Sequence, residues 1–277
     1  MEGEHFDLLV CAGVRAEKWM ANLDPERDKN NISLLERVLE KVTCNRFILI
    51  STVDVYGNKV GVDENSVIDP LTTDYYGRHR LEFEEFVARQ FNTHTIIRLP
   101  GLFGKGLKKN FIFDILNPIP KFLSPALLKS WESRLNEDDL TTIESIYSPR
   151  PDGIYEKQIN TSEDKLSEIF NKINFSSLTF TDSRSSFQFY NLQNIGTDIE
   201  MLLAENIRLI NLTAAPVSAA EIYSTCFGNE FVNPISNSPI KYDIQTLHSP
   251  FGSYFYSRDD VLSEIKVFID INKSGNQ

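Results

Sequence analysis

The chain has 277 residues, of which 41% are hydrophobic and 24% are charged, and its formal net charge is -11. This length suits one large domain, or one domain with a smaller companion, and the apolar content is enough for a packed core. The negative charge argues against a nucleic-acid partner, because phosphate backbones need a basic surface. No apolar run is long enough for a membrane-spanning helix, so no membrane partner is expected.

The cysteines and the start of the chain indicate a cytoplasmic protein without a metal site. Cys11, Cys44 and Cys226 lack the spacing of metal ligands, and their odd number suits a reducing compartment. The four histidines are scattered along the chain. The opening residues MEGEH lack the positive and apolar regions of a signal peptide.

The first predicted elements are a short strand and a helix. Residues 6–11 (FDLLVC) form an apolar strand pattern that ends at Ala12 and Gly13. A helix is expected over about 30–41, because apolar residues recur there at helical spacing. Its first turn can be capped by one of three polar side chains, Asp28, Asn30 or Asn31.

The stretch from Phe47 to Gly106 organises the rest of the chain. An apolar strand, 47–50, ends in hydroxyl residues, a helix pattern opens at Tyr75 and Tyr76, and a second apolar strand, 95–99, leads into a glycine-bearing turn. Strand, helix and strand in this order predict an α/β fold with a parallel sheet and crossover helices. Ligands in such sheets bind at the carboxyl ends of the strands, where the hydroxyls and glycines fall.

The remaining chain divides into two segments. Residues 118–186 are rich in Ser, Asn, Asp and Pro, and they predict a mostly helical insertion or lid. Residues 187–277 resume the alternation of strands and helices, with a capping box expected where Ser218 precedes Glu221 by three positions. The predicted division is therefore 1–117, 118–186 and 187–277.

Thr52, Tyr76 and Arg80 form a pattern that can transfer protons: a hydroxyl at a strand end, a phenol on the next helix and a cation one turn later. The Arg80 charge would lie beside the phenol and lower the pKa of Tyr76. Thr52 would hold a substrate oxygen while the phenol gives or takes the proton. On spacing alone, a stacked surface pair of Tyr76 and Arg80 is the alternative, and the adjacent His79 is expected to be solvated.

Three phrases in this order, STVDVYG, YGRHRLEFEEF and RLPGLFG, resemble the extended short-chain dehydrogenase/reductases, the NAD-dependent epimerase/dehydratase family. Two later phrases, FQFYNLQNIGTDIEMLL and INLTAAPVSAAEIY, are similar to the family's next elements, so the likeness covers most of the chain except about 118–186. It implies a Rossmann-like, doubly wound, mainly parallel sheet with a smaller α+β substrate region. It also implies NAD or NADP as cofactor and a nucleotide-activated sugar as substrate.

The resemblance assigns roles to individual residues. Thr52 matches the substrate-hydroxyl anchor, Tyr76 the general acid/base, and Arg80 the place of a lysine that holds the nicotinamide ribose. Asp54, which follows the strand end, is a candidate for substrate contact from its position alone, and an exposed loop acid is the equal alternative. The residues expected to border the cofactor are Cys11, Ala12, Gly13, Asn31, Leu99, Pro100 and Gly101. A homodimer formed through the helices that begin near Asn31 and Tyr76 is also implied.

Two departures from the family pattern leave alternatives open. Arginine replaces the lysine, and a planar guanidinium must contact a ribose differently. FDLLVC matches the fourth strand of the pattern, so the first strand and the glycine-rich turn that cradles the pyrophosphate are missing. The chain is then either an N-terminally truncated enzyme or a catalytically inactive descendant that serves as a binding or assembly module.

The stretch GLFGKGLKK contains glycines and lysines that can approach phosphates, but its spacing is not that of a dinucleotide loop. An ordinary turn is one interpretation. In the other, Lys105 and Lys108 bind the diphosphate of a nucleotide-sugar substrate.

Overall fold

A computed structural model describes residues 3–106, 109–158, 163–249 and 252–274. Its central sheet has four strands in the order β1 (His5–Cys11), β2 (Thr43–Thr52), β4 (His94–Leu99) and β11 (Leu209–Asn211). All three pairings are parallel. The predicted α/β fold with a mainly parallel sheet is therefore confirmed. None of the helices in these ranges has the length and apolarity that crossing a membrane requires.

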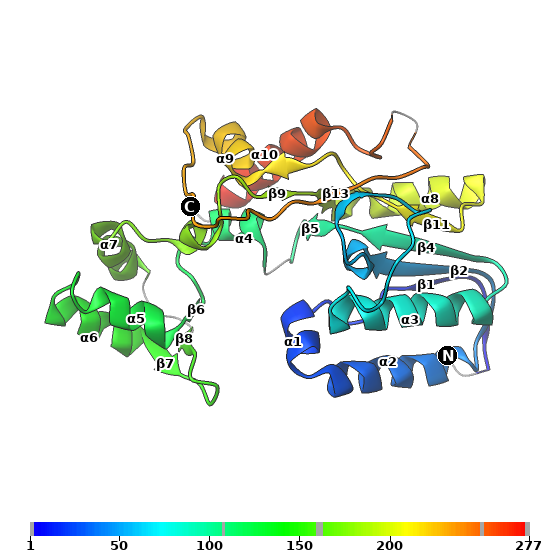
Figure 1. Ribbon diagram of the computed structural model, residues 1–277, viewed down its shortest axis with the longest axis horizontal. Helices are drawn as coiled ribbons and strands as arrows, with labels where there is room; N and C mark the ends of the chain where they lie inside the picture. The colour runs from blue at the N-terminus through cyan, green and yellow to red at the C-terminus, as the bar shows by residue number, and fades with distance from the viewer. Residues whose placement is uncertain (1–2, 107–108, 159–162, 250–251, 275–277) are drawn as a thin grey trace.

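Helices cover both faces of this sheet (Figure 1). On one face α2 (Pro25–Leu39) and α3 (Tyr75–Gln90) lie side by side. On the other lies α8 (Ile195–Glu205). Side chains alternate between the faces: Phe47 packs with the α2 and α3 core, and Ile48 packs with the core that includes Leu202 of α8. This alternation explains why the strand patterns read as nearly continuous apolar runs, because a parallel sheet is buried on both sides.

The first helices differ from the prediction. α2 begins at Pro25 rather than near Asn30, and its N-cap is Asp24, whose carboxylate accepts a hydrogen bond from the Arg27 N–H at 3.1 Å. The prediction of a cap at Asp28, Asn30 or Asn31 is therefore wrong. Proline fits the first helical position because it has no N–H to leave unpaired. A six-residue helix, α1 (Lys18–Leu23), precedes α2 and was not predicted.

Beside the central sheet lie short strand pairs and three helices with a common core. β5 (Gly101–Phe103) pairs with β10 (Phe189–Asn191), β9 (Ser186–Phe187) with β12 (Val217–Ser218), and β3 (Val60–Val62) with β13 (Asp243–Ile244). The three helices are α4 (Phe111–Leu116), α9 (Ala219–Phe227) and α10 (Arg258–Ser274). The predicted capping box of Ser218 and Glu221 is confirmed at the start of α9.

Most of the 118–186 segment forms a lobe to one side of the sheet (Figure 1). It contains α5 (Pro125–Trp131), α6 (Glu137–Ile146), α7 (Asp164–Lys172) and the small sheet of β6 (Phe122–Leu123), β8 (Tyr155–Lys157) and β7 (Tyr147–Pro149). A core of its own includes the fully buried Trp131 and Leu166. The division at 117 and 186, and a lid role for the lobe, remain predictions.

Candidate functional site

The site is built where β2 ends and α3 begins. β2 ends at Thr52, and a short 3-10 turn (Val53–Val55) follows, in which the Asp54 N–H donates to the Thr52 hydroxyl at 3.2 Å. Asp74 caps α3 by accepting from the Gly77 N–H at 2.9 Å. A Cβ at Gly77 would overlap the carbonyl oxygen of Asp54. Glycine at this position therefore lets the first turn of α3 lie directly against the turn that carries Thr52.

Thr52 and Tyr76 meet in this arrangement. The Tyr76 side chain is buried, with 7% of its surface exposed, and Thr52 is one of the groups close enough to the phenol to influence its pKa. Burial raises the pKa of Tyr76, and the Asp54 charge acts in the same direction. The charges of Arg80 and Lys18 and the nearby Thr52 hydroxyl oppose that rise without reversing it. The predicted net lowering of the Tyr76 pKa is therefore wrong, because loss of solvent around the phenol outweighs the nearby cations.

Arg80 lies beside Tyr76 as its spacing predicts, but it is sealed into the interior with 4% of its surface exposed. Its guanidinium binds both carboxylate oxygens of Asp28, one of them at 2.9 Å, and donates to the Arg15 carbonyl at 2.6 Å. Its Cζ lies 3.9 Å from the centroid of the Tyr76 ring. In this conformation the guanidinium is committed to protein groups, so the expected ribose contact of Arg80 is not supported.

His79 joins the same buried group. Its Nδ1 lies 2.8 Å from Asp28 Oδ2, and 5% of its surface is exposed. The expectation of a solvated His79 is therefore wrong. Asp28 was missed as a functional neighbour because its partners lie more than fifty positions away on α3. The signal in the sequence was that Asp28 is an acidic residue on the face of α2 that packs against the rest of the protein.

A second group of charges surrounds Asp54. Lys18 Nζ lies 2.9 Å from Asp54 Oδ1, and Lys59 Nζ lies 3.5 Å from the same oxygen. The Tyr242 hydroxyl donates to this oxygen at 3.4 Å. Burial raises the pKa of Tyr242 to about 12. Sequence reasoning selected Asp54 but missed these partners, because Lys18 lies in the unpredicted α1 and Tyr242 lies 188 positions from Asp54.

A buried network supports the end of β2 from behind. Arg98 of β4 binds Glu84 of α3, with Nη2 2.6 Å from Oε2, and donates to the Tyr56 hydroxyl at 2.8 Å. The Ser51 hydroxyl donates to Glu84, and Asn211 of β11 donates to the Tyr56 oxygen at 3.0 Å. The network thus ties β2, β4, β11 and α3 together next to Thr52.

The residues predicted to border a cofactor divide into three groups. Cys11 is buried at the end of β1, and Ala12 and Gly13 follow it on the surface. Leu99 and Pro100 are buried at the end of β4, and Gly101 is exposed. Because β1, β2 and β4 are adjacent and parallel, these two groups and Thr52 share one edge of the sheet. Asn31 belongs to neither group and lies on α2.

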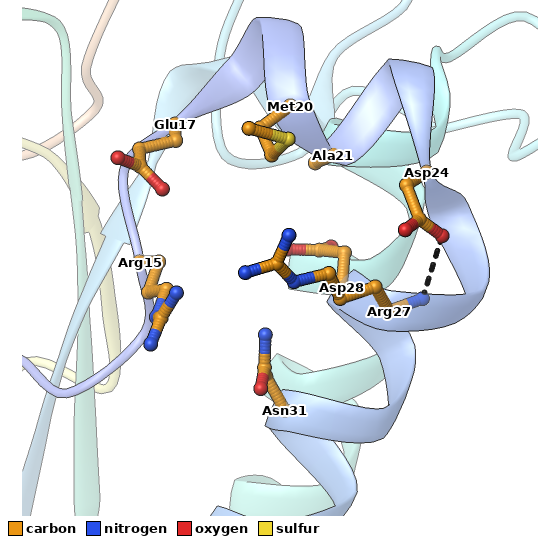
Figure 2. A pocket seen from close by; sticks show the side chains of 8 residues that line it. All are labelled: Arg15, Glu17, Met20, Ala21, Asp24, Arg27, Asp28 and Asn31. Atoms are coloured by element: carbon orange, nitrogen blue, oxygen red, sulfur yellow. Dashed lines mark hydrogen bonds between the residues drawn. The ribbon is translucent and has the colours of Figure 1, made fainter. Parts of the chain in front are cut away.

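Asn31 lines a small hollow between α2 and the loop after β1 (Figure 2). Its other lining residues are Arg15, Glu17, Met20, Ala21, Asp24, Arg27 and Asp28. The hollow has a volume of about 10 Å³, which is about the space of one water molecule. A dinucleotide therefore fits the site in part: the exposed backbone at 12–13 and 101 can border it, whereas the Asn31 hollow and Arg80 cannot receive it.

The glycine and lysine stretch after β5 behaves as a turn. Gly104 and Gly106 have φ values of 148° and 88°, which are conformations that favour glycine. Lys105 is exposed, Lys108 lies outside the described residues, and the Lys109 ammonium donates to the Ala16 carbonyl. The ordinary-turn interpretation accounts for the glycines. No three His, Cys, Asp or Glu side chains within the described ranges gather closely enough to hold a metal ion.

A larger hollow, of about 540 Å³, opens at the start of α10. It is lined by Ala215, Ser253, Tyr254, Tyr256, Ser257, Arg258 and Asp260. Its aromatic hydroxyls are already bonded, that of Tyr254 to Asp243 and that of Tyr256 to Asp198. None of the predicted site residues lines it, so this hollow is separate from the Thr52 and Tyr76 pair.

No protein-family model matches the chain, and no curated protein matches it. Solved structures do. The UDP-glucose 4-epimerase of Thermotoga maritima, solved with UDP-glucose, has a TM-score of 0.58 and 12% identity over 98% of this chain and 78% of the epimerase. A dTDP-4-dehydrorhamnose reductase of Clostridium acetobutylicum has a TM-score of 0.58 and 14% identity over 96% of this chain and 81% of the reductase.

A UDP-glucuronic acid 4-epimerase of Bacillus cereus, a Tyr-to-Phe variant solved with a UDP-sugar and NAD, has a TM-score of 0.54 and 16% identity. The match covers 97% of this chain and 76% of that epimerase. At such low identity, these likenesses show that the chain has the Rossmann-like fold of nucleotide-sugar epimerases and reductases.

Proposed function

We propose that this chain is an NAD(P)-dependent protein of the epimerase, dehydratase or reductase type that acts on a nucleotide-activated sugar. The observation that carries the proposal is that Thr52, at the end of β2, and Tyr76, in the first turn of α3, come close together at the carboxyl ends of parallel strands. The fold supports it, because similar structures were solved with UDP-sugars and one of these with NAD.

The two hydroxyls have different tasks in this proposal. The raised pKa of Tyr76 keeps the phenol protonated near neutral pH, so it can donate its proton to a substrate oxygen and recover it in the reverse direction. The Thr52 hydroxyl holds the same substrate oxygen in place. A nicotinamide dinucleotide would supply or accept a hydride. Ala12, Gly13 and the 99–101 stretch would border that cofactor. Asp54 would face the sugar, and Lys105 and Lys108 its diphosphate.

A second candidate is a binding or assembly module that uses no dinucleotide. The hydrogen bonds of Arg80 favour this second candidate, because the guanidinium that would hold the ribose is already bound by Asp28 and the Arg15 carbonyl. A homodimer through α2 and α3 is compatible with either candidate.

To test the proposal, the chain is incubated with NAD and either UDP-glucose or UDP-glucuronic acid, and separately with NADPH and dTDP-activated 4-keto sugars. The products are followed by proton NMR. Conversion is expected, with a loss of about 10²-fold or more in Tyr76→Phe, since a positioned acid/base contributes about that factor. Tyr75→Phe is the matched control, because the neighbouring Tyr75 is 48% exposed. No conversion of any of these sugars, or equal rates in both variants, would contradict the assigned role of Tyr76.

A further inference from the structure

The helix that sequence reasoning missed, α1, is fastened to the start of α3 by two side chains on one of its faces. Lys18 Nζ lies 2.9 Å from Asp54 Oδ1 and 3.3 Å from Asp74 Oδ2. Four positions later, which on a helix is the same face, Asn22 accepts from the Tyr76 N–H at 3.0 Å and donates to Asp74 at 3.2 Å. α1 therefore contacts both the residue that carries the phenol and the cap of its helix.

The charges around the phenol come from three elements. Asp54 of the 3-10 turn disfavours an ionised Tyr76, while Lys18 of α1 and Arg80 of α3 favour it. Arg80 is matched by Asp28, which binds it with both carboxylate oxygens. Asp54 is matched chiefly by Lys18, since Lys59 is farther away, at 3.5 Å.

Lys18 is well placed to act through Asp54. The Lys18 side chain is 35% exposed and that of Asp54 is 18% exposed, so water screens the pair incompletely. Asp54, Tyr242 and Asp74 act on the Lys18 ammonium, and the Lys109 ammonium lies near enough to repel it. Asp54 also donates its N–H to the Thr52 hydroxyl, so a change in its position reaches the hydroxyl that lies near the phenol.

We propose that Lys18 is a positioning residue for Tyr76: it neutralises Asp54 beside the phenol and holds α1 against the first turn of α3. The inference rests on the proposed role of Tyr76 as the group that transfers the proton. It assigns to α1 the electrostatic task that the family resemblance assigns to the residue at position 80.

The test measures the ionisation of the phenol in the full chain without any dinucleotide or sugar. Difluorotyrosine is incorporated at position 76, so that a single phenol titrates near neutral pH and can be followed by fluorine NMR. Lys18→Met keeps the length of the side chain and removes its charge, and Lys18→Arg keeps the charge. The double variant Lys18→Met with Asp54→Asn removes both charges. Lys29→Met, on the solvent side of α2, is the control for net charge.

Lys18→Met is expected to raise the midpoint by about one pH unit, because Asp54 then keeps only its more distant cations, such as Lys59 at 3.5 Å, and its charge acts more strongly on the phenol. Lys18→Arg, Lys29→Met and the double variant are expected to stay near the parent value. If Lys18 had only a structural role, the midpoint would stay unchanged in Lys18→Met, or it would stay raised in the double variant. Either result overturns the inference. Since no cofactor is present, failure to bind NADH would count against the proposed function and not against this inference.

Discussion

Arg80 shows what spacing along the chain can and cannot predict at the scale of single residues. Residues four apart on a helix are neighbours, and the guanidinium does stack on the Tyr76 ring. Its partner Asp28 lies 52 positions away, and its burial depends on α2 docking beside α3. The contact could therefore be predicted from the sequence, whereas the exposure of Arg80 and its commitment to Asp28 could not.

Asp28→Asn is expected to lower the free energy of unfolding by about 3 kcal/mol, because removing one partner of a buried pair leaves the other charge uncompensated. Denaturant unfolding followed by circular dichroism measures the change. Glu85→Gln is the control, because Glu85 and Arg89 form an exposed pair at 3.8 Å, which is worth only about 0.5 kcal/mol. Equal effects of the two substitutions would show that Arg80 does not depend on Asp28.

Asp114 of α4 should make stability depend on pH. Burial raises its pKa from 3.8 to about 6. An acid with a raised folded-state pKa stabilises the fold below its unfolded pKa and loses that contribution as the pH rises through the folded value. Asp114→Asn should therefore be more stable than the parent chain by about 1 kcal/mol at about pH 7, after allowance for solvent screening, and should lose this advantage at about pH 4. An advantage of the same size at both pH values would contradict the assignment.

At the scale of elements, the sequence predicts best where apolar periodicity is strong. β2, β4 and α3 lie where their patterns place them, because each buries long apolar side chains in the sheet cores. α1 is six residues long and buries only Ala21, while its large apolar residues Trp19 and Leu23 are 56% and 73% exposed, so it has no apolar face to detect. Its position depends on the polar contacts of Lys18 and Asn22, and these polar contacts carry no periodic signal.

Gly77 is the position where the packing of two elements decides the site. Gly77→Ala is expected to destabilise the chain by about 2 kcal/mol or more, because the new Cβ would push the first turn of α3 away from the Asp54 carbonyl. Gly196→Ala is the matched control: it lies in α8 with open space around it, so alanine should be stabilising by up to about 1 kcal/mol. Thermal unfolding of both variants measures the difference. If Gly77→Ala left the thermal stability unchanged, α3 and the 3-10 turn that follows Thr52 would not need their close approach.

At the scale of the whole molecule, a parallel sheet brings together residues that are far apart in the chain. The carboxyl ends of β1, β2 and β4 form one edge, so Ala12, Thr52 and Gly101 are neighbours there as their order in the strands predicts. The lobe of α5, α6 and α7 has a separate core.

The central claim is that this sheet edge binds a nicotinamide dinucleotide beside Thr52 and Tyr76. The most direct measurement is a titration of the full chain with NADH and NADPH, followed by nicotinamide fluorescence. Ala12→Glu adds a negative charge at the exposed end of β1 and should repel the cofactor phosphates, while Ala12→Ser adds only a hydroxyl. The account predicts saturable binding that Ala12→Glu weakens by about tenfold or more, or about 1.4 kcal/mol, and that Ala12→Ser leaves unchanged. No saturation up to about millimolar ligand, or binding that Ala12→Glu does not alter, would contradict it and favour the module that uses no dinucleotide.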